Sequence, residues 1–288
     1  MDNRCLACHS KTVDLLIDKF NLQGEVASDF SSEVNHLLIN CKHLSNPYLA
    51  LLIHRLAKKK IQNDDLYREE KKHANSILYS QYKKWVAFVN ENDESLHIAA
   101  KLAVVGNIVD YGAHSVPTDI PAKIEELLAL DFALDDRDEM FAEIEKAESV
   151  LYLGDNAGEI VFDKLFIQHL NHPNLTYVVR GNPIINDVTL EDAEQVGMQD
   201  VCRVISNGHD APSTLVDNCS EEFQELYTKV TVVISKGQGN FEGLLNEKRK
   251  SLYFMLMAKC DIMAEMLGVN KGDLIITKKQ EGSLWHLK

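Results

Sequence analysis

The chain has 288 residues, of which 45% are hydrophobic and 26% are charged, a composition typical of a globular protein. Lys and Arg number 30 against 44 Asp and Glu, which gives a formal net charge of −14. Because so acidic a chain repels a phosphate backbone, we expect no nucleic-acid partner. An acidic protein that handles a small phosphorylated molecule needs a local positive centre, either a metal ion or a lysine.

The sequence has no feature that predicts export or membrane insertion. Asp2 and Arg4 follow Met1 without the apolar core that a signal peptide requires. No apolar stretch approaches the ~20 residues needed to cross a bilayer. The cysteines are scattered and do not suggest a disulfide framework: Cys5, Cys8, Cys41, Cys202, Cys219 and Cys260. We therefore expect a cytoplasmic protein with reduced thiols and no membrane partner, and its oligomeric state stays open.

The first half of the chain has the pattern of helices. Residues 64–91 carry apolar side chains at three- and four-residue steps with charged residues between them, which predicts one long amphipathic helix. Further helices are expected over 95–109, 124–130 and 140–146. We therefore predict an all-helical domain over residues 1–147.

The second half alternates short apolar runs with helical stretches. The predicted strands are 150–153, 175–179, 203–206, 230–235, 252–257 and 274–277. This alternation indicates an α/β fold, a Rossmann-like and mostly parallel sheet over residues 148–288. We expect the helical region to pack over the carboxyl ends of the strands, where such sheets bind their ligands.

Polar side chains follow three of these predicted strands. Asp155 and Asn156 lie on a glycine-bearing turn after the first strand, Asp187 lies after the second, and Lys236 with Gly237 follow the fourth. Two carboxylates and an amide oxygen are hard ligands that suit a divalent cation such as Mg²⁺ or Mn²⁺. Such a cation polarises a phosphoryl group, while the lysine balances its charge and the glycine lets backbone N–H groups approach. One such turn alone is more often structural, but three at the same end of a sheet favour a phosphate site.

The same segments resemble a known family. Residues 155–159, 180–189 and 236–242 closely resemble the motifs of the damage-control phosphatases, formerly the domain of unknown function 89 family. The resemblance covers nearly the whole chain and includes a Gly-Asn-x-x-Asp segment at residues 106–110. The Cys5-x-x-Cys8 start resembles the microbial branch of that family.

Membership of this family would imply a divalent-metal-dependent phosphatase acting on a small phosphorylated metabolite. The substrates implied are sugar phosphates, phosphopantetheine derivatives or damaged phosphometabolites, and the single cation would be Mg, Mn, Co or Ni. The resemblance assigns Asp155, Asn156 and Asp187 to the metal and Lys236 to the phosphate, which makes these four the catalytic residues.

Further residues are expected to bind the substrate: Asn107, Asp110, Gly158, Glu159, Asn182, Gly237 and Asn240. Asn107 and Asp110 would reach over the sheet from the helical region, or else cap a helix beside Gly106. The helix that starts after Gly158 would direct backbone N–H groups at the phosphate. Glu159 would orient the ligand, or else owe its place to the helix dipole.

Several alternatives stay open at the level of sequence. Cys5 and Cys8, with His9, are either half of a zinc site or a pair of packing thiols. The rival functions are an S-adenosylmethionine-dependent carboxyl methyltransferase, once proposed for members of the family, and a non-catalytic phosphometabolite sensor. A dinucleotide site is not expected, because the turn at Asp155 lacks the Gly-x-Gly-x-x-Gly order. The nucleophile is either water or the carboxylate of Asp155, and the absence of an Asp-x-Asp motif favours water.

Overall fold

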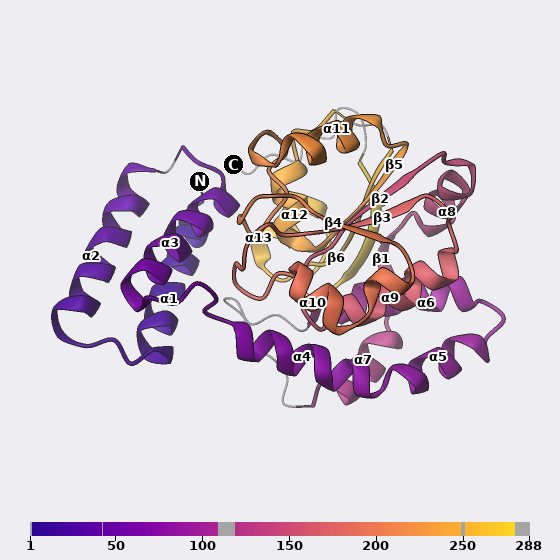
Figure 1. Cartoon of the computed structure of the whole chain (residues 1–288), viewed down its shortest axis with the longest axis horizontal. Helices are drawn as coiled ribbons and strands as arrows, with labels where there is room; N and C mark the ends of the chain where they lie inside the picture. The colour runs from indigo at the N-terminus through magenta and orange to yellow at the C-terminus, as the bar shows by residue number, and fades with distance from the viewer. Residues whose placement is uncertain (1, 42, 109–118, 249–250, 280–288) are drawn as a thin grey trace.

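The computed structural model describes residues 2–41, 43–108, 119–248 and 251–279, and its two parts lie side by side (Figure 1). The smaller part is a bundle of three helices: α1 (Asn3–Lys19), α2 (Gly24–Asn40) and α3 (Asn46–Ile61). Phe30, Val34 and Leu38 recur at four-residue steps on α2 and are buried in a core that belongs to the bundle.

The next helices join the larger part of the molecule. They are α4 (Arg68–Ser80), α5 (Tyr82–Asn90), α6 (Ser95–Val105), the 3-10 turn η1 (Gly106–Ile108) and α7 (Ile120–Leu128). Residues 64–91, predicted as one helix, form two because the chain turns at Gln81, whose N–H bonds to the carbonyls of Leu78 and Tyr79. The apolar face of both helices is nevertheless buried as the periodicity indicates, since Leu78 and Trp85 lie in the core shared with the sheet.

A seven-stranded sheet forms the centre of the larger part. Its strands are β1 (Phe132–Asp135), β2 (Val150–Leu153), β3 (Leu175–Val179), β4 (Arg203–Ser206), β5 (Val232–Lys236), β6 (Leu252–Met257) and β7 (Leu274–Lys278). Their order across the sheet is β1-β7-β6-β5-β2-β3-β4, and every neighbouring pair is parallel except β6 and β7. The predicted α/β class with a mostly parallel sheet is confirmed.

Helices cover both faces of the sheet (Figure 1). One apolar core contains side chains of α4 to α7 together with α8 (Arg137–Lys146), α9 (Glu159–Leu170), α10 (Leu190–Gln195) and η2 (Met198–Asp200). The other contains side chains of α11 (Glu221–Lys229), α12 (Gly237–Leu244) and α13 (Asp261–Leu267), next to η3 (Val216–Asn218). Because both faces are covered, β2, β3, β5 and β6 are buried along their whole length, which explains their uninterrupted apolar sequences.

Residues 132–135 correct the prediction that the first half is entirely helical. They form β1, which pairs only with β7 at the edge of the sheet. The strand has only four residues, and its side chains alternate between half-buried and exposed, unlike the central strands, which are buried throughout. The domain boundary at 147/148 stays a prediction; the cores themselves divide earlier, between the α1–α3 bundle and α4.

The bundle contacts loops at the carboxyl ends of the strands, as expected. Lys58 Nζ on α3 donates to the Pro183 carbonyl after β3, and Arg55 Nε donates to Asp210 Oδ2 after β4 at 2.9 Å. β2 lies between β5 and β3 in the sheet. The polar turns that follow these three strands therefore lie close together at the carboxyl ends of the strands. Within the described ranges, no helix is both long and apolar enough to cross a membrane.

Candidate active site

Two backbone segments fix the first pair of acidic residues. The turn after β2 lies alongside the loop after β3: Val188 N–H donates to the Asp155 carbonyl at 2.8 Å, and Ala157 N–H donates to the Asn186 carbonyl at 2.8 Å. Asn156 and Asp187 therefore face each other across an antiparallel bridge. This pairing brings Asp155, Asn156 and Asp187 together although 31 residues separate the bridged positions, 156 and 187.

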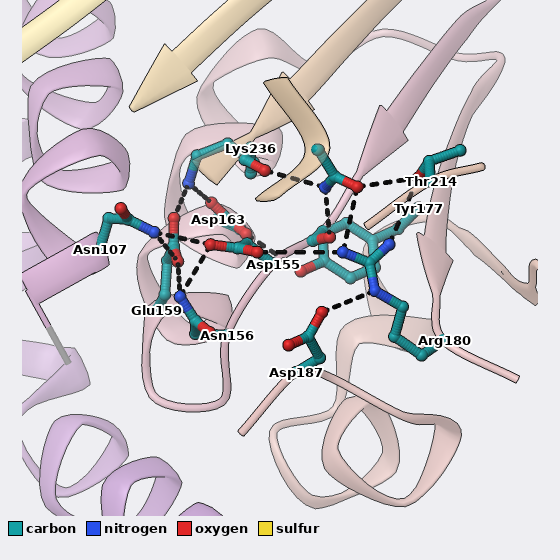
Figure 2. Close-up of polar contacts among 12 residues, drawn as sticks. Asn107, Asp155, Asn156, Glu159, Asp163, Tyr177, Arg180, Asp187, Thr214 and Lys236 are labelled. Atoms are coloured by element: carbon teal, nitrogen blue, oxygen red, sulfur yellow. Dashed lines mark hydrogen bonds and ion pairs between the residues drawn. The ribbon is translucent and has the colours of Figure 1, made fainter. Parts of the chain in front are cut away.

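Two amides hold the carboxylates of Asp155 and Glu159 close to each other (Figure 2). Asn107 Nδ2 donates to Asp155 Oδ2 at 2.9 Å and to Glu159 Oε2 at 2.8 Å. Asn156 Nδ2 donates to the same two oxygens, at 2.8 and 3.3 Å. All four side chains are buried. The amide nitrogen of Asn156 is thus used inside the protein, and its Oδ1 is the atom left to face a cation.

Asn107 reaches this cluster because α6 and α9 pack closely. It lies on η1 directly after α6, and a Cβ on the preceding Gly106 would stand 2.9 Å from the Phe162 ring of α9. Of the two proposed roles for Asn107, contact with the site therefore fits the structure better than a helix cap. Its Oδ1 is buried and has no hydrogen-bond partner among the described residues. Asp110 lies outside the described residues.

Lys236 lies in the fully buried part of the site. Its Nζ donates to Glu159 Oε1 and Asp163 Oδ1, both at 2.5 Å, and to the Ala103 carbonyl at 2.7 Å, and its side chain is fully buried. Burial lowers the pKa of Lys236, but the charges of Asp163 and Glu159 outweigh it, so the pKa lies above its ordinary value. All three N–H bonds of this ammonium are directed at protein oxygens. The predicted phosphate contact therefore does not fit the described geometry.

Asp163 is a buried acid that the motifs did not single out. Its carboxylate accepts hydrogen bonds from the Tyr152 hydroxyl at 2.7 Å and the Tyr177 hydroxyl at 3.0 Å, besides that from Lys236. Burial raises the pKa of Asp163 to about 6, and Lys236 opposes the rise. Asp163 lies one helical turn after Glu159 on α9, so both acids bind the Lys236 ammonium from the same face of the helix.

Arg180 is the second buried cation of the site, after Lys236, and the sequence-based prediction did not name it. Its Nε donates to Asp187 Oδ2 at 2.7 Å, and its Nη2 donates to Asn240 Oδ1 at 3.0 Å and lies 3.9 Å from Asp155 Oδ1. Asn240 in turn donates from Nδ2 to the carbonyls of Gly154 and Lys236, at 3.1 and 2.8 Å. The predicted substrate residue Asn240 thus positions Arg180 and ties two strand ends together, rather than presenting a polar group to a ligand.

Three other predicted substrate residues have different surroundings. The Gly158 N–H already donates to Asn75 Oδ1 at 2.6 Å, so it is not directed at a phosphate. Asn182 is exposed, unlike the buried residues of the cluster. Gly237 does belong to the site: its φ is +77°, and a Cβ there would lie 1.8 Å from Asp155 Oδ2. Only glycine fits both the left-handed backbone and this close approach.

The buried charges of the site do not balance. Four carboxylates (Asp155, Glu159, Asp163 and Asp187) are compensated by two cations (Arg180 and Lys236) in this cluster of described residues. Burial raises the pKa of Asp155 well above its usual value, Glu159 and Asp187 add to the rise, and Lys259 and Arg180 oppose it. Buried carboxylates are costly without a partner, and a divalent cation would supply the two missing charges.

The donor set fits a hard divalent cation. Asp155, Asn156 and Asp187 offer two carboxylates and an amide oxygen, which suit Mg²⁺ or Mn²⁺ better than a soft metal. Among the described residues, no group of three or more His, Cys, Asp and Glu side chains is arranged to hold a metal ion. Cys5 is half-buried, and burial raises the pKa of its thiol to about 12. The zinc and packing alternatives for Cys5 and Cys8 both stay predictions.

Lys259 is a cation near Asp155 that the sequence-based prediction did not name. It follows β6, and its positive charge is the foremost one acting to lower the pKa of Asp155. Its backbone N–H donates to Gln238 Oε1 at 3.3 Å, next to Gly237. The signal was available, because ligands of such sheets bind just after the strands and residue 259 follows the strand predicted over 252–257.

Comparisons with known proteins identify the family of the chain. The sequence profile of the damage-control phosphatase ARMT1-like domain matches residues 1–275. A damage-control phosphatase of Archaeoglobus fulgidus is 32% identical over 240 residues, which cover 80% of this chain and 81% of that protein. The damage-control phosphatase PH1575 of Pyrococcus horikoshii is 37% identical over 186 residues, 64% of this chain and 65% of that protein. The crystal structure of PH1575, a DUF89 family protein, has a TM-score of 0.85 at 28% identity and covers 97% of this chain and 99% of that one.

Proposed function

We propose that this chain is a divalent-metal-dependent phosphatase of small phosphate monoesters. The premise is that the chain belongs to the family of damage-control phosphatase ARMT1-like domains. The names of the Archaeoglobus fulgidus and Pyrococcus horikoshii relatives support a phosphatase that acts on damaged metabolites. Family membership is what the motifs around Asp155, Asp187 and Lys236 indicated. The microbial Cys5-x-x-Cys8 branch stays a prediction.

The observation that carries this proposal is the excess of carboxylates over cations in the buried cluster, four against two. In the proposed site Asp155, Asn156 and Asp187 hold one cation, drawn from Mg²⁺, Mn²⁺, Co²⁺ and Ni²⁺. When bound, such a cation polarises a phosphoryl group and neutralises its charge. Glu159, held by Lys236 and Asn107, keeps Asp155 in place through the amides that the two acids share.

We assign different tasks to the two lysines. Lys236 is a positioning residue that balances Glu159 and Asp163 in the fully buried part of the site, because its three N–H bonds are all used there. Lys259 acts on Asp155 from the end of β6 and is the cation that we assign to the phosphate. This division gives an acidic protein the local positive centre that phosphate binding requires.

Water is the nucleophile that fits the surroundings of Asp155. Its Oδ2 accepts two amide N–H groups and lies directly against Gly237, which leaves no room there for a phosphoryl group. Its Oδ1 faces Arg180 at 3.9 Å. Direct attack by water transfers the phosphoryl group in one step, with the alcohol of the ester as leaving group and inorganic phosphate as product.

The test is phosphate release from protein stripped with a chelator and then supplied with Mg²⁺, Mn²⁺, Co²⁺ or Ni²⁺. The panel contains sugar phosphates, nucleotides, phosphopantetheine and an aryl phosphate, and Asp187→Asn serves as the inactive control. Metal-dependent release by the wild type alone supports the proposal. Absence of release with every metal, from protein that is folded by circular dichroism, rejects it; tight binding without turnover then indicates a sensor, and binding of S-adenosylmethionine indicates a methyltransferase.

A further inference from the structure

A cavity of about 300 Å³ lies between the α1–α3 bundle and helices α12 and α13. Cys5 and His9 of α1, His54 of α3, Gln238 and Glu242 of α12 and Met263 of α13 are among its lining residues. It is separate from the carboxylate cluster of Figure 2, none of whose labelled residues lines it. The proposed reaction leaves it without a role, although it has the size of a small-molecule site.

Two elements connect the cavity with the candidate active site. Gln238 lines the cavity directly after Gly237, which lies against Asp155, and its Oε1 accepts the Lys259 N–H at 3.3 Å. Ile185 lines the cavity two residues before Asp187. The cavity and the carboxylate cluster are therefore lined by neighbouring residues of the same two segments.

The polar groups of the wall are mostly satisfied by one another. Glu242 accepts from Asn46 Nδ2 at 2.7 Å and from Gln238 Nε2 at 3.1 Å. Because Asn46 gives its nitrogen to Glu242, its Oδ1 accepts from His9, whose Nε2 lies 2.8 Å away and carries the proton. This chain of hydrogen bonds spans α1, α3 and α12, and burial raises the pKa of Glu242.

The charges of the wall disfavour a second anionic group on the ligand. Arg4 is a basic lining residue, and its guanidinium already bonds to Asp2 at 2.9 Å and to Glu265 at 2.6 and 2.8 Å. Glu242 and Asp261 add acidic groups to the wall. A phosphate or carboxylate entering this space would lose its hydration without gaining a free cation.

His54 provides an unpaired polar group. Its ring Nδ1 donates to the Ala50 carbonyl at 2.9 Å, so in the neutral ring Nε2 is an acceptor, and Nε2 has no hydrogen-bond partner among the described residues. The residue is only 2% exposed, and burial lowers its pKa to about 4, which keeps the ring neutral. A buried acceptor without a partner is costly, and Nε2 is itself buried rather than exposed to the cavity.

We propose that this cavity receives the organic group of the phosphate monoester and selects a compact, uncharged group. The inference rests on the proposed function, because the ester's phosphate has to lie at the carboxylate cluster. A volume of about 300 Å³ limits the group to the size of a small molecule. Groups with a second phosphate or a carboxylate are excluded by charge.

The test separates binding in the cavity from turnover. Straight-chain alkylphosphonates from methyl to hexyl contain a carbon–phosphorus bond in place of the ester, so they report binding alone. Their dissociation constants are measured by calorimetry on the full chain with Mg²⁺ present. Each added methylene should tighten binding about fourfold until the cavity is full, as expected for ~0.8 kcal/mol per buried CH₂. A terminal carboxylate on the hexyl chain should remove most of the gain, and a terminal hydroxyl should keep it.

Two variants fill the cavity from different elements, and one serves as the matched control. Ala50→Phe on α3 and Cys5→Leu on α1 should each flatten the dependence on chain length to less than twofold per methylene while leaving methylphosphonate binding unchanged. Leu52→Phe, which lies on α3 at a different hollow beside Leu37 and Leu56, should keep the full dependence. Thermal unfolding verifies that each variant is folded.

The outcomes are distinguishable from those of the proposed function. Chain-length-dependent binding that both filling variants abolish supports the cavity even if no ester is hydrolysed. Hydrolysis of esters with no dependence on chain length, or with the same dependence in Ala50→Phe as in Leu52→Phe, overturns the inference and leaves the phosphatase proposal intact. Failure of all the phosphonates to bind overturns it as well.

Discussion

Gly237 and Asp155 lie so close together that a single methyl group at position 237 would stand 1.8 Å from Asp155 Oδ2. The two residues follow neighbouring strands, β5 and β2, and the carboxylate occupies the space that the side chain of any other residue type at position 237 would fill. The glycine therefore defines the position of a proposed metal ligand, and the substitution Gly237→Ala tests that relationship directly.

Gly237→Ala should abolish metal-dependent turnover, because the new methyl group displaces the Asp155 carboxylate. Gly268→Ala is the matched control: its φ is +70°, close to the +77° of Gly237, but a Cβ at position 268 would have no atom within 4 Å, so only the backbone conformation is strained. Both variants should lose about 1–2 kcal/mol of unfolding free energy for the left-handed backbone. Turnover and calorimetric Mn²⁺ binding are the measurements, and equal activity of the two variants would contradict the role given to Gly237.

The two lysines should give different signatures. Lys236→Met leaves Glu159 and Asp163 buried without their cation, so its unfolding free energy should fall by about 3–5 kcal/mol. Lys259→Met should keep near wild-type stability but raise KM for a phosphate ester and weaken the binding of inorganic phosphate. Urea unfolding and steady-state kinetics distinguish the two. An unchanged KM in Lys259→Met would contradict the role given to Lys259 and would favour Lys236 as the phosphate ligand.

Asp155→Asn should stabilise the metal-free protein while removing its response to metal. The neutral amide relieves the repulsion from Glu159 and Asp187 that, together with burial, disfavours the charged carboxylate. Wild-type protein should gain about 2.7 kcal/mol when Mn²⁺ is raised to 100 times its dissociation constant, and the variant should gain nothing. Thermal unfolding with chelator and with Mn²⁺ measures both effects. A variant less stable than the wild type in chelator would mean that the surplus charge is already compensated in the free protein.

His54 should make the protein sensitive to mild acid. Its pKa is about 4 in the folded chain and ~6.5 when unfolded, so the unfolded state binds the proton more readily. The stability contributed by the neutral ring is complete above pH 6.5 and is lost as the pH falls toward 4, which amounts to about 2 kcal/mol at pH 5. Between pH 7 and pH 5, the unfolding free energy of His54→Leu should therefore fall by about 2 kcal/mol less than that of the wild type. The exposed His73, changed to Gln, should leave the pH dependence as it is.

The sequence allowed the central strands to be placed well because their environment imposes one simple pattern. β2, β3, β4 and β6 were predicted at the bounds that the structure has; three of them are buried throughout, and even the more exposed edge strand β4 kept a recognisable apolar run. β1 was missed, since a four-residue edge strand buries only alternate residues. The motifs also named the residues that meet around Asp155, because strand order brings their turns to one end of the sheet.

The sequence could not reveal which polar atoms are already used inside the protein. Whether the Lys236 ammonium or the Gly158 N–H faces a ligand depends on Asp163 and Asn75, one from the helix after β2 and one from the distant helix α4. Periodicity places Asp163 on a helix without indicating that it points at Lys236. Such pairings are set by the packing of α4, α6 and α9, which no local pattern encodes.

The place of β7 in the sheet has a consequence for the order in which the chain assembles. β7 lies between β1 and β6, so β1, formed by residues 132–135, has no strand to pair with until residues 274–278 have emerged from the ribosome. Until then one side of β6 presents unpaired backbone groups, the kind of edge at which chains associate wrongly. The parallel strands β2 to β6 can pair earlier, but completion of the sheet depends on β7, which is synthesised after all the other strands. A nascent chain that stalls after β6 would therefore expose an open edge beside an otherwise assembled site.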